Sequence, residues 1–167
     1  PVLADDKVLF MGDAVALVVA KTPEIAEQAA KLVKVNYEVL PAIFSPQEAM
    51  LPEAPKLHPK GNILYHFKIR KGDVEEGFKK SDVIIERTYQ TQHVDHAQLE
   101  PEAALAYYDK NGILTIVAPT QHVFFDRLNI IRALGVPKED VRVIQPKVGG
   151  AFGKREDIYA QIHVALA

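Results

Sequence analysis

The sequence contains no cysteine, and this absence excludes several kinds of chemistry within the chain. Disulfides, thiolate nucleophiles, cysteine-bound zinc and iron–sulfur clusters all require cysteine side chains. An excess of one charge is also missing, because 20 Lys and Arg residues stand against 22 Asp and Glu residues without a block of like charges. We therefore expect no nucleic-acid partner and no anionic membrane surface as a partner.

Long apolar runs are missing too. The longest run, residues 14–20, is too short to span a bilayer, and no secretory signal is visible, so we expect a cytoplasmic protein. The chain begins at Pro1 without a methionine, and its last ten residues form an apolar helical pattern without a stop signal. We therefore expect a piece of a longer polypeptide.

The composition is that of a folded protein, with 48% hydrophobic and 25% charged residues. Residues 7–20 predict two strands around a Gly12-Asp13 turn, and residues 22–33 predict a helix capped by Thr22. A strand is expected at 35–39. Five prolines between Pro41 and Gly61 predict a linker that holds a short helix near residues 46–49.

The second half of the chain alternates short strands and helices. Thr120 is expected to cap a helix whose apolar face contains Phe124, Leu128, Ile131 and Leu134. Gly135 followed by Pro137 is expected to end this helix. Further strands are predicted at 63–69, 83–91 and 141–145, and two strands joined by a hairpin at Asp109–Gly112 are predicted within 102–119. Further helices are predicted at 72–81 and from Arg155 onward. Together these elements predict the α+β fold class.

The stretch KVGGAFGKRED, residues 147–157, lies between a predicted strand and a predicted helix. This geometry presents backbone N–H groups to an anion, but the glycine spacing fits neither a dinucleotide-binding fingerprint nor a P-loop. Phe152 lies between glycines on a loop, where it has little to pack against, and it suits the wall of a pocket. Arg155 would fall in the first turn of a helix, where a cation is disfavoured, so it needs an anionic partner in the protein or in a ligand.

Three blocks of the sequence resemble the molybdenum-binding large subunit of the xanthine dehydrogenase / aldehyde oxidase family. They are DKVLFMGDAVALVVA, HAQLEPEAALA and PTQHVFFDRLNIIRALGVPKEDVRVIQPKVGGAFGKRED. The resemblance implies a hammerhead-type α/β piece at residues 1–50, a proline-rich linker at 51–62 and the first part of a molybdopterin-binding domain at 63–167.

The resemblance also implies a function and a set of site residues. The function is oxidative hydroxylation of an aldehyde or an N-heteroaromatic substrate, with water as the oxygen source. Gln121 matches a glutamine that hydrogen-bonds a ligand on molybdenum. Phe152 matches a ring that packs against a flat substrate, and Glu156 matches a residue that helps orient the substrate. The remaining cofactor-binding positions are Gly150, Ala151 and Gly153, whose backbone passes the metal and the pterin.

The resemblance implies molybdopterin as the cofactor, with molybdenum held by the pterin dithiolene and by no protein side chain. It places the 2Fe-2S clusters and FAD on partner subunits or domains. It also places the glutamate that acts as general base in a later segment, so this piece alone is expected to be inactive. The chain departs from the family at Lys154, where a second glycine is common, and at Glu102, where many members have His.

Four other groups of residues admit a functional or a structural interpretation. His93 and His96 resemble a metal pair but lack a third ligand nearby, which favours a structural role. Glu100 and Glu102 share a strand face, where carboxylates are more often structural than an acid/base pair. The other two groups are His122, a pocket-lining or capping residue, and Tyr107-Tyr108, which is expected to place one ring inside the sheet and one outside.

Two other functions remain open from the sequence. The glycine loop at 149–153 also suits a non-catalytic module that binds an anion or a nucleotide. The chain could alternatively serve only as an interface-forming scaffold, in which case it would expose apolar surface.

Overall fold

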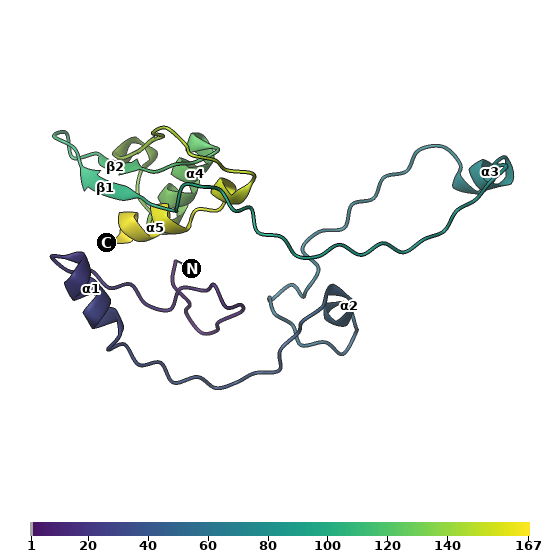
Figure 1. Cartoon of the computed structure of the whole chain (residues 1–167), viewed down its shortest axis with the longest axis horizontal. Coiled ribbons are helices and arrows are strands. Elements are labelled where there is room, and N and C mark those ends of the chain that lie inside the picture. The colour runs from purple at the N-terminus through teal and green to yellow at the C-terminus, as the bar shows by residue number, and fades with distance from the viewer. Residues whose placement is uncertain (1) are drawn as a thin grey trace. The chain divides into compact units, whose positions relative to one another are not determined.

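The computed structural model describes residues 2–167, which form two compact units (Figure 1). The first unit combines residues 2–35 with residues 94–167, and the second unit is Asn36–His93. The second unit holds two short helices, α2 (Pro46–Ala49) and α3 (Val74–Lys79), at the places where the sequence predicts them.

A small mixed sheet lies at the centre of the first unit. Strand β1 (Leu105–Tyr108) pairs antiparallel with β2 (Leu114–Val117), and β2 pairs parallel with β3 (Val141–Ile144). Because parallel neighbours need a crossover, the chain forms helix α4 (Val123–Leu134) between β2 and β3. Helix α5 (Tyr159–Leu166) packs with α4 and the sheet, and the α+β class predicted from the sequence is confirmed.

The core of the first unit lies between the sheet and these two helices. Strand β2 is the central strand, and side chains on both of its faces are buried, including that of Thr115. The Thr115 hydroxyl donates to the Ile113 carbonyl (3.3 Å), which satisfies its polar group. The buried apolar side chains are Leu114, Ile116, Ala118, Ile130, Val141 and Val143.

The hairpin between β1 and β2 is confirmed. The Asp109 carboxylate accepts hydrogen bonds from the N–H groups of Asn111 (2.8 Å) and Ile113 (3.0 Å), and Gly112 has a φ of 77°. The prediction for Tyr107 and Tyr108 is wrong, because both rings are exposed, by 44% and 73%. Strand β1 lies at the edge of the sheet, where neither ring is enclosed.

Helix α4 begins later than predicted. His122 is its N-cap, and Nδ1 of that ring accepts from the Phe125 N–H (3.2 Å). Thr120 lies before the helix, where its hydroxyl accepts from the His122 N–H (3.0 Å) and so supports the cap from outside. Gly135 ends the helix in the left-handed conformation with a φ of 68°, as the sequence predicts.

The apolar face predicted for α4 is confirmed only in part, because Ile131 and Leu134 pack against the core but Phe124 and Leu128 do not. Phe124 is 76% exposed and Leu128 is 42% exposed, whereas Asp126 and Ile130 are completely buried. Ile130 belongs to the core, and the Asp126 carboxylate accepts a hydrogen bond from Gln161 on α5. Packing and this polar contact therefore select a buried face that apolar spacing predicts only in part.

Helix α1 (Pro23–Ala30) has the predicted start. The Thr22 hydroxyl accepts from the Ile25 N–H (3.3 Å), and Pro23 occupies the first helical position. The predicted turn before it is also present, with the Asp13 N–H donating to the Phe10 carbonyl (3.2 Å).

The strands predicted at residues 7–20, 35–39, 63–69 and 83–91 are wrong. Within residues 2–167 the only sheet is β1-β2-β3, so none of these four segments forms a strand ladder. A strand requires a neighbour whose N–H and C=O groups pair with its own, and apolar alternation does not supply one. Most of their apolar side chains remain exposed, as Phe67 (79%) and Ile69 (89%) show.

The longest helix described has 12 residues, and no helix within residues 2–167 combines the length and the apolar character that a bilayer span requires.

Gly135→Ala is expected to lower the free energy of unfolding by about 1–2 kcal/mol, because a Cβ is disfavoured at positive φ. No atom lies within 4 Å of the added Cβ, so the loss reports backbone strain alone. Hydrogen exchange of the α4 amides in the native protein measures this change in the free energy of unfolding. Gly135→Asn is the matched control and should lose less, because Asn adopts this conformation more readily. Equal losses of stability in Gly135→Ala and Gly135→Asn would contradict a left-handed conformation at Gly135.

Candidate functional site

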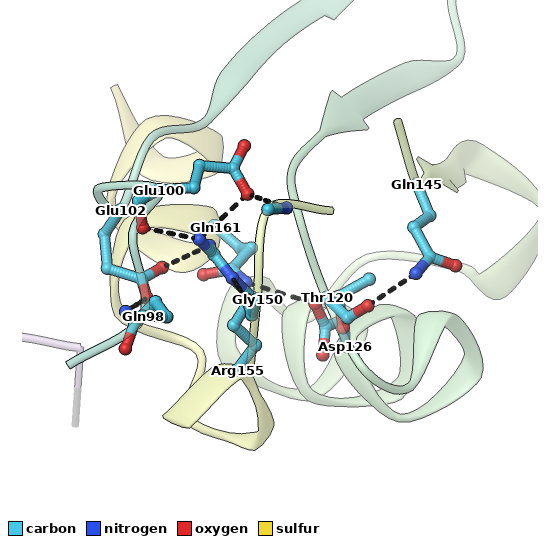
Figure 2. Close-up of polar contacts among 10 residues, drawn as sticks. Gln98, Glu100, Glu102, Thr120, Asp126, Gln145, Gly150, Arg155 and Gln161 are labelled. Carbon is cyan, nitrogen blue, oxygen red and sulfur yellow. Dashed lines mark hydrogen bonds and ion pairs between the residues drawn. The ribbon is translucent and has the colours of Figure 1, made fainter. Parts of the chain in front are cut away.

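The candidate site forms where three distant segments meet in the first unit. The glycine loop, residues 149–153, follows β3, and the segment 98–102 precedes β1. Gln121 lies between β2 and α4. Figure 2 shows the polar contacts that join the loop to the segment 98–102 around Arg155 and Gly150.

The glycine loop has an unusual backbone. Gly150, Phe152 and Gly153 have φ values of 109°, 53° and 96°, so three of four consecutive residues lie at positive φ. A Cβ at Gly149 would lie 2.7 Å from Cβ of Glu100, and a Cβ at Gly150 would lie 3.1 Å from Cβ of Gln98. Glycine is therefore needed at 149 for space and at 150 for both space and conformation.

Gln121 is hydrogen-bonded to the loop through its side chain. Its Oε1 accepts from the Gly153 N–H (2.9 Å), and its Nε2 donates to Oε1 of Glu156 over a longer distance of 3.4 Å. A carboxamide has two N–H donors, and the second has no acceptor within residues 2–167. The structure thus brings together Gln121, Gly153 and Glu156, three of the residues that the resemblance implies.

Phe152 lies at the surface beside them. Its ring is 76% exposed although its φ of 53° places it in a region that bulky residues rarely adopt. The surrounding hydrogen bonds must hold this conformation, because the ring itself gains little by burial. Gln121, Gly153 and Glu156 are exposed as well, so all four can reach a bound molecule.

Arg155 has the anionic partner that the sequence predicts, and the partner is in the protein. Its guanidinium is completely buried and forms ion pairs with Glu100 (3.0 Å) and Glu102 (3.2 Å). The predicted helical turn at 155–157 is wrong, since Lys154–Glu156 is a 3₁₀ turn and α5 starts at Tyr159. The ion pairs and the glycine loop hold this segment outside the helix.

Lys154, the departure from the family, does not need a glycine conformation here. It begins the 3₁₀ turn, where a Cβ is accommodated, and its Nζ lies 5.4 Å from the centre of the Tyr159 ring. At this distance the cation is attracted to the ring face. The adjacent Gly153 retains the positive φ that shapes the loop.

A second polar layer lies behind the loop. Asp126 and Gln161 are buried, with Nε2 of Gln161 donating to Oδ2 of Asp126 (3.2 Å), while Oδ1 of Asp126 and Oε1 of Gln161 have no partner among the described residues. Burial raises the pKa of Asp126, and hydrogen bonds from Thr120 and Gln161 and the charge of nearby His122 oppose this only in part. A protonated Asp126 would relieve the cost of these unpaired acceptors.

This polar layer reaches Gln121 through the backbone. Thr120 is buried next to Asp126, and its carbonyl accepts from Nε2 of Gln145 (2.8 Å). The contacts fix the residue that immediately precedes Gln121.

Sequence reasoning misses several of these contacts. It does not single out Gln161, although a glutamine inside the apolar pattern of the last helix is a signal for a buried polar partner. It also misses the contact between Glu100 and Gly149, although the predicted need of Arg155 for an anion points toward the acidic pair at 100 and 102.

The structure also places the other residues that the sequence offers as candidates for a functional role. Glu100 and Glu102 bind Arg155, which favours the structural interpretation of this pair. His122 is a cap. Within residues 2–167, no three His, Asp or Glu side chains gather into a set that could hold a metal ion, and His93 and His96 are not joined by a third ligand.

The donors at the site suit a cofactor that carries its own metal ligands. They are a neutral amide and loop backbone rather than thiolates or clustered imidazoles. A neutral amide can donate to an oxygen on a metal without changing the charge of the centre, and an exposed ring beside it can stack on a flat molecule. The residues present therefore fit a molybdenum–pterin group.

Two family models match the chain. Residues 57–167 match the molybdopterin cofactor-binding domain, and residues 1–41 match the hammerhead domain of aldehyde oxidase and xanthine dehydrogenase. The first match contains the whole candidate site.

Individual proteins show the same relationship. The chain is 40% identical to a probable xanthine dehydrogenase subunit of Bacillus subtilis and 39% identical to the nicotinate dehydrogenase large molybdopterin subunit of Eubacterium barkeri, in each case over 99% of the chain. It spans 22% and 39% of the lengths of these relatives. Among solved structures, the aldehyde oxidoreductase from Desulfovibrio gigas matches with a TM-score of 0.89 and 30% identity, over 99% of this chain and 18% of that one.

Asp126→Asn is expected to change how stability depends on pH. Because the folded pKa of Asp126 is raised, folding favours the protonated carboxyl, and stability falls as pH rises from the unfolded value of about 3.9 toward the raised folded value. The Asn variant has no proton to lose, so its stability relative to the parent should increase across this window. Urea unfolding of the native protein between about pH 4 and pH 8 measures the difference.

The exposed Asp140→Asn is the control and should leave the slope unchanged. Identical pH profiles for the parent and Asp126→Asn would mean that the carboxyl is not held protonated by burial.

Proposed function

The chain belongs to the aldehyde oxidase and xanthine dehydrogenase family, and from this premise we propose that it forms part of a molybdenum hydroxylase. The proposed reaction replaces a C–H bond of an aldehyde or an N-heteroaromatic substrate by C–OH. The oxygen comes from water, and two electrons and two protons leave toward an acceptor. The observation that carries the proposal is the grouping of Gln121, Phe152, Gly153 and Glu156 on one exposed surface.

Each of these residues has a proposed role. The free N–H of Gln121 donates to an oxygen on the bound cofactor, while its Oε1 stays on the Gly153 N–H and fixes the direction of the amide. The backbone of Gly150, Ala151 and Gly153 borders the cofactor. When bound, the molybdenum–pterin group supplies the redox centre that takes up the two electrons.

Phe152 and Glu156 are proposed to contact the substrate. The exposed ring stacks on a flat molecule, and the Glu156 carboxylate, close to the Gln121 amide, accepts a hydrogen bond from a substrate N–H or O–H. We assign positioning roles to these residues and place the general base in a later segment, as the resemblance implies.

The proposal extends to organisation and partners. We keep the division into residues 1–50, 51–62 and 63–167, with the general base in a segment beyond those present here. The 2Fe-2S clusters and FAD are assigned to partner subunits or domains. The names of the relatives describe subunits, which supports assembly with other subunits. The expected cytoplasmic location stays a prediction.

The alternative, a non-catalytic module that binds an anion or nucleotide, has less support. The N–H groups of Gly149 and Gly153 already donate to Glu100 and Gln121. The segment after the loop is a 3₁₀ turn rather than the N-terminus of a helix. Calorimetric titration of inorganic phosphate or ATP is expected to show no binding at the loop.

Isotope labelling of the native protein, purified with its neighbouring subunits, tests the proposed reaction. The protein is incubated in H₂¹⁸O with aldehydes and N-heteroaromatics and with a dye as electron acceptor. We expect a hydroxylated product that carries one ¹⁸O atom from the solvent. A product whose oxygen comes from O₂, or no turnover of either class by protein that contains molybdenum, would contradict the proposal.

Gln121→Glu is expected to lower kcat by about 10²-fold, because it keeps the acceptor for Gly153 but loses the donor that faces the cofactor. Molybdenum content should remain at the parent level. Gln28→Glu makes the same change on the exposed surface of α1, away from the candidate site, and should leave kcat nearly unchanged. If kcat of Gln121→Glu equals that of the parent protein, the proposed role of the Gln121 amide as a donor to the cofactor is wrong.

Phe152→Ala is expected to raise KM for a flat substrate by up to about 10-fold, because a stacked ring contributes about 0.5–1.5 kcal/mol beyond its buried area. Steady-state kinetics measure KM and kcat together. Phe124→Ala on α4, with the same 76% exposure, is the matched control and should leave KM unchanged. If both variants behave alike, Phe152 is not a substrate wall.

A further inference from the structure

We propose that Arg155 and Glu100 are positioning residues that hold the glycine loop in the conformation that presents Phe152 and Gly153. The loop conformation follows from the contacts alone, whereas its consequence for turnover rests on the proposed function.

Arg155 uses nearly all its donors within the protein. Nε donates to the Gly150 carbonyl (2.8 Å) and Nη1 to Glu102 (3.2 Å). Nη2 donates to both the backbone carbonyl (2.8 Å) and the carboxylate (3.0 Å) of Glu100. The planar guanidinium therefore joins the loop to the segment 98–102 in a geometry that a single ammonium cannot reproduce (Figure 2).

The burial of Arg155 shows how tightly this arrangement is determined. Its side chain is 0% exposed, whereas Glu100 and Glu102 are about one-third exposed, at 34% and 33%. An unpaired buried cation is strongly unfavourable, so the cation and the two carboxylates must stay together. Because the carboxylates keep access to water, they bear less of this desolvation penalty than the arginine does.

Glu100 connects the cation directly to the loop. Its Oε2 accepts from both Arg155 and the Gly149 N–H (2.7 Å), and its own N–H donates to the Gly149 carbonyl (3.3 Å). In the described part of the chain, Glu102 contacts Arg155 and Gln98 but makes no hydrogen bond to the loop. The two carboxylates therefore have different roles, and loss of Glu100 should matter more.

Arg155 also connects the loop to Gln121. Its backbone carbonyl accepts from the Gln121 N–H (3.2 Å), while its side chain binds the Gly150 carbonyl at the other end of the loop. The strained φ of Phe152 lies between these two attachment points. When Arg155 is replaced, the loop loses the constraint that offsets this strain.

The test compares Arg155→Lys, Arg155→Met, Glu100→Gln and Glu102→Gln in the native protein. Hydrogen exchange of a peptide covering residues 148–154 reports the loop, and exchange of α4 reports overall stability. Molybdenum content, kcat and KM are measured on the same samples. Arg132→Met, an exposed arginine at the end of α4, is the control.

We expect Glu100→Gln and Arg155→Lys to speed exchange in the loop by about 10-fold while α4 keeps its protection, because only local contacts are lost. The value of kcat/KM should fall on the order of 10²-fold, the loss caused by a misplacement of about 1 Å. Glu102→Gln should have a much smaller effect on both. Arg155→Met should be the most severe variant, and if it fails to fold, Arg155→Lys and Glu100→Gln decide the question.

Unchanged loop exchange in Arg155→Lys and Glu100→Gln would overturn the proposal. Equal acceleration in the loop and in α4 would also overturn it, because it would show only a loss of overall stability. If the parent protein contains no molybdenum and no activity, the proposed function fails, while the exchange data still judge the positioning role independently.

Discussion

The site depends on one buried charge. Arg155 has no access to solvent, and its ion pairs with Glu100 and Glu102 bring the segment before β1 against the loop after β3. The same side chain holds the Gly150 carbonyl, and its backbone holds Gln121. Because a buried cation tolerates few arrangements, one residue determines the relative positions of three segments that are far apart in the sequence.

The division of polar groups at the site follows from this constraint. Contacts inside the protein occupy the N–H groups of Gly149 and Gly153, so the loop acts as a shaped wall. The groups that remain available include one amide donor of Gln121, the carboxylate of Glu156 and the ring of Phe152. These groups can orient a cofactor and a flat substrate, whereas the redox chemistry must come from the cofactor.

Local sequence signals predict only part of this structure. Thr22, Asp109 and Gly135 predict their cap, hairpin and helix end correctly, because each acts through nearby backbone groups. Alternation at 63–69 and 83–91 predicts strands wrongly, because a strand needs a partner that the pattern does not contain. At the site, the need of Arg155 for an anion follows from sequence, but the contact between Glu100 and Gly149 spans 49 positions and depends on the fold.

The central claim, that this surface holds a molybdenum–pterin group, is tested most directly by metal and pterin analysis of the native protein purified with its neighbouring subunits. Elemental mass spectrometry is expected to find about one molybdenum per chain, together with a pterin released on denaturation. Folded protein that contains neither molybdenum nor pterin would contradict the claim.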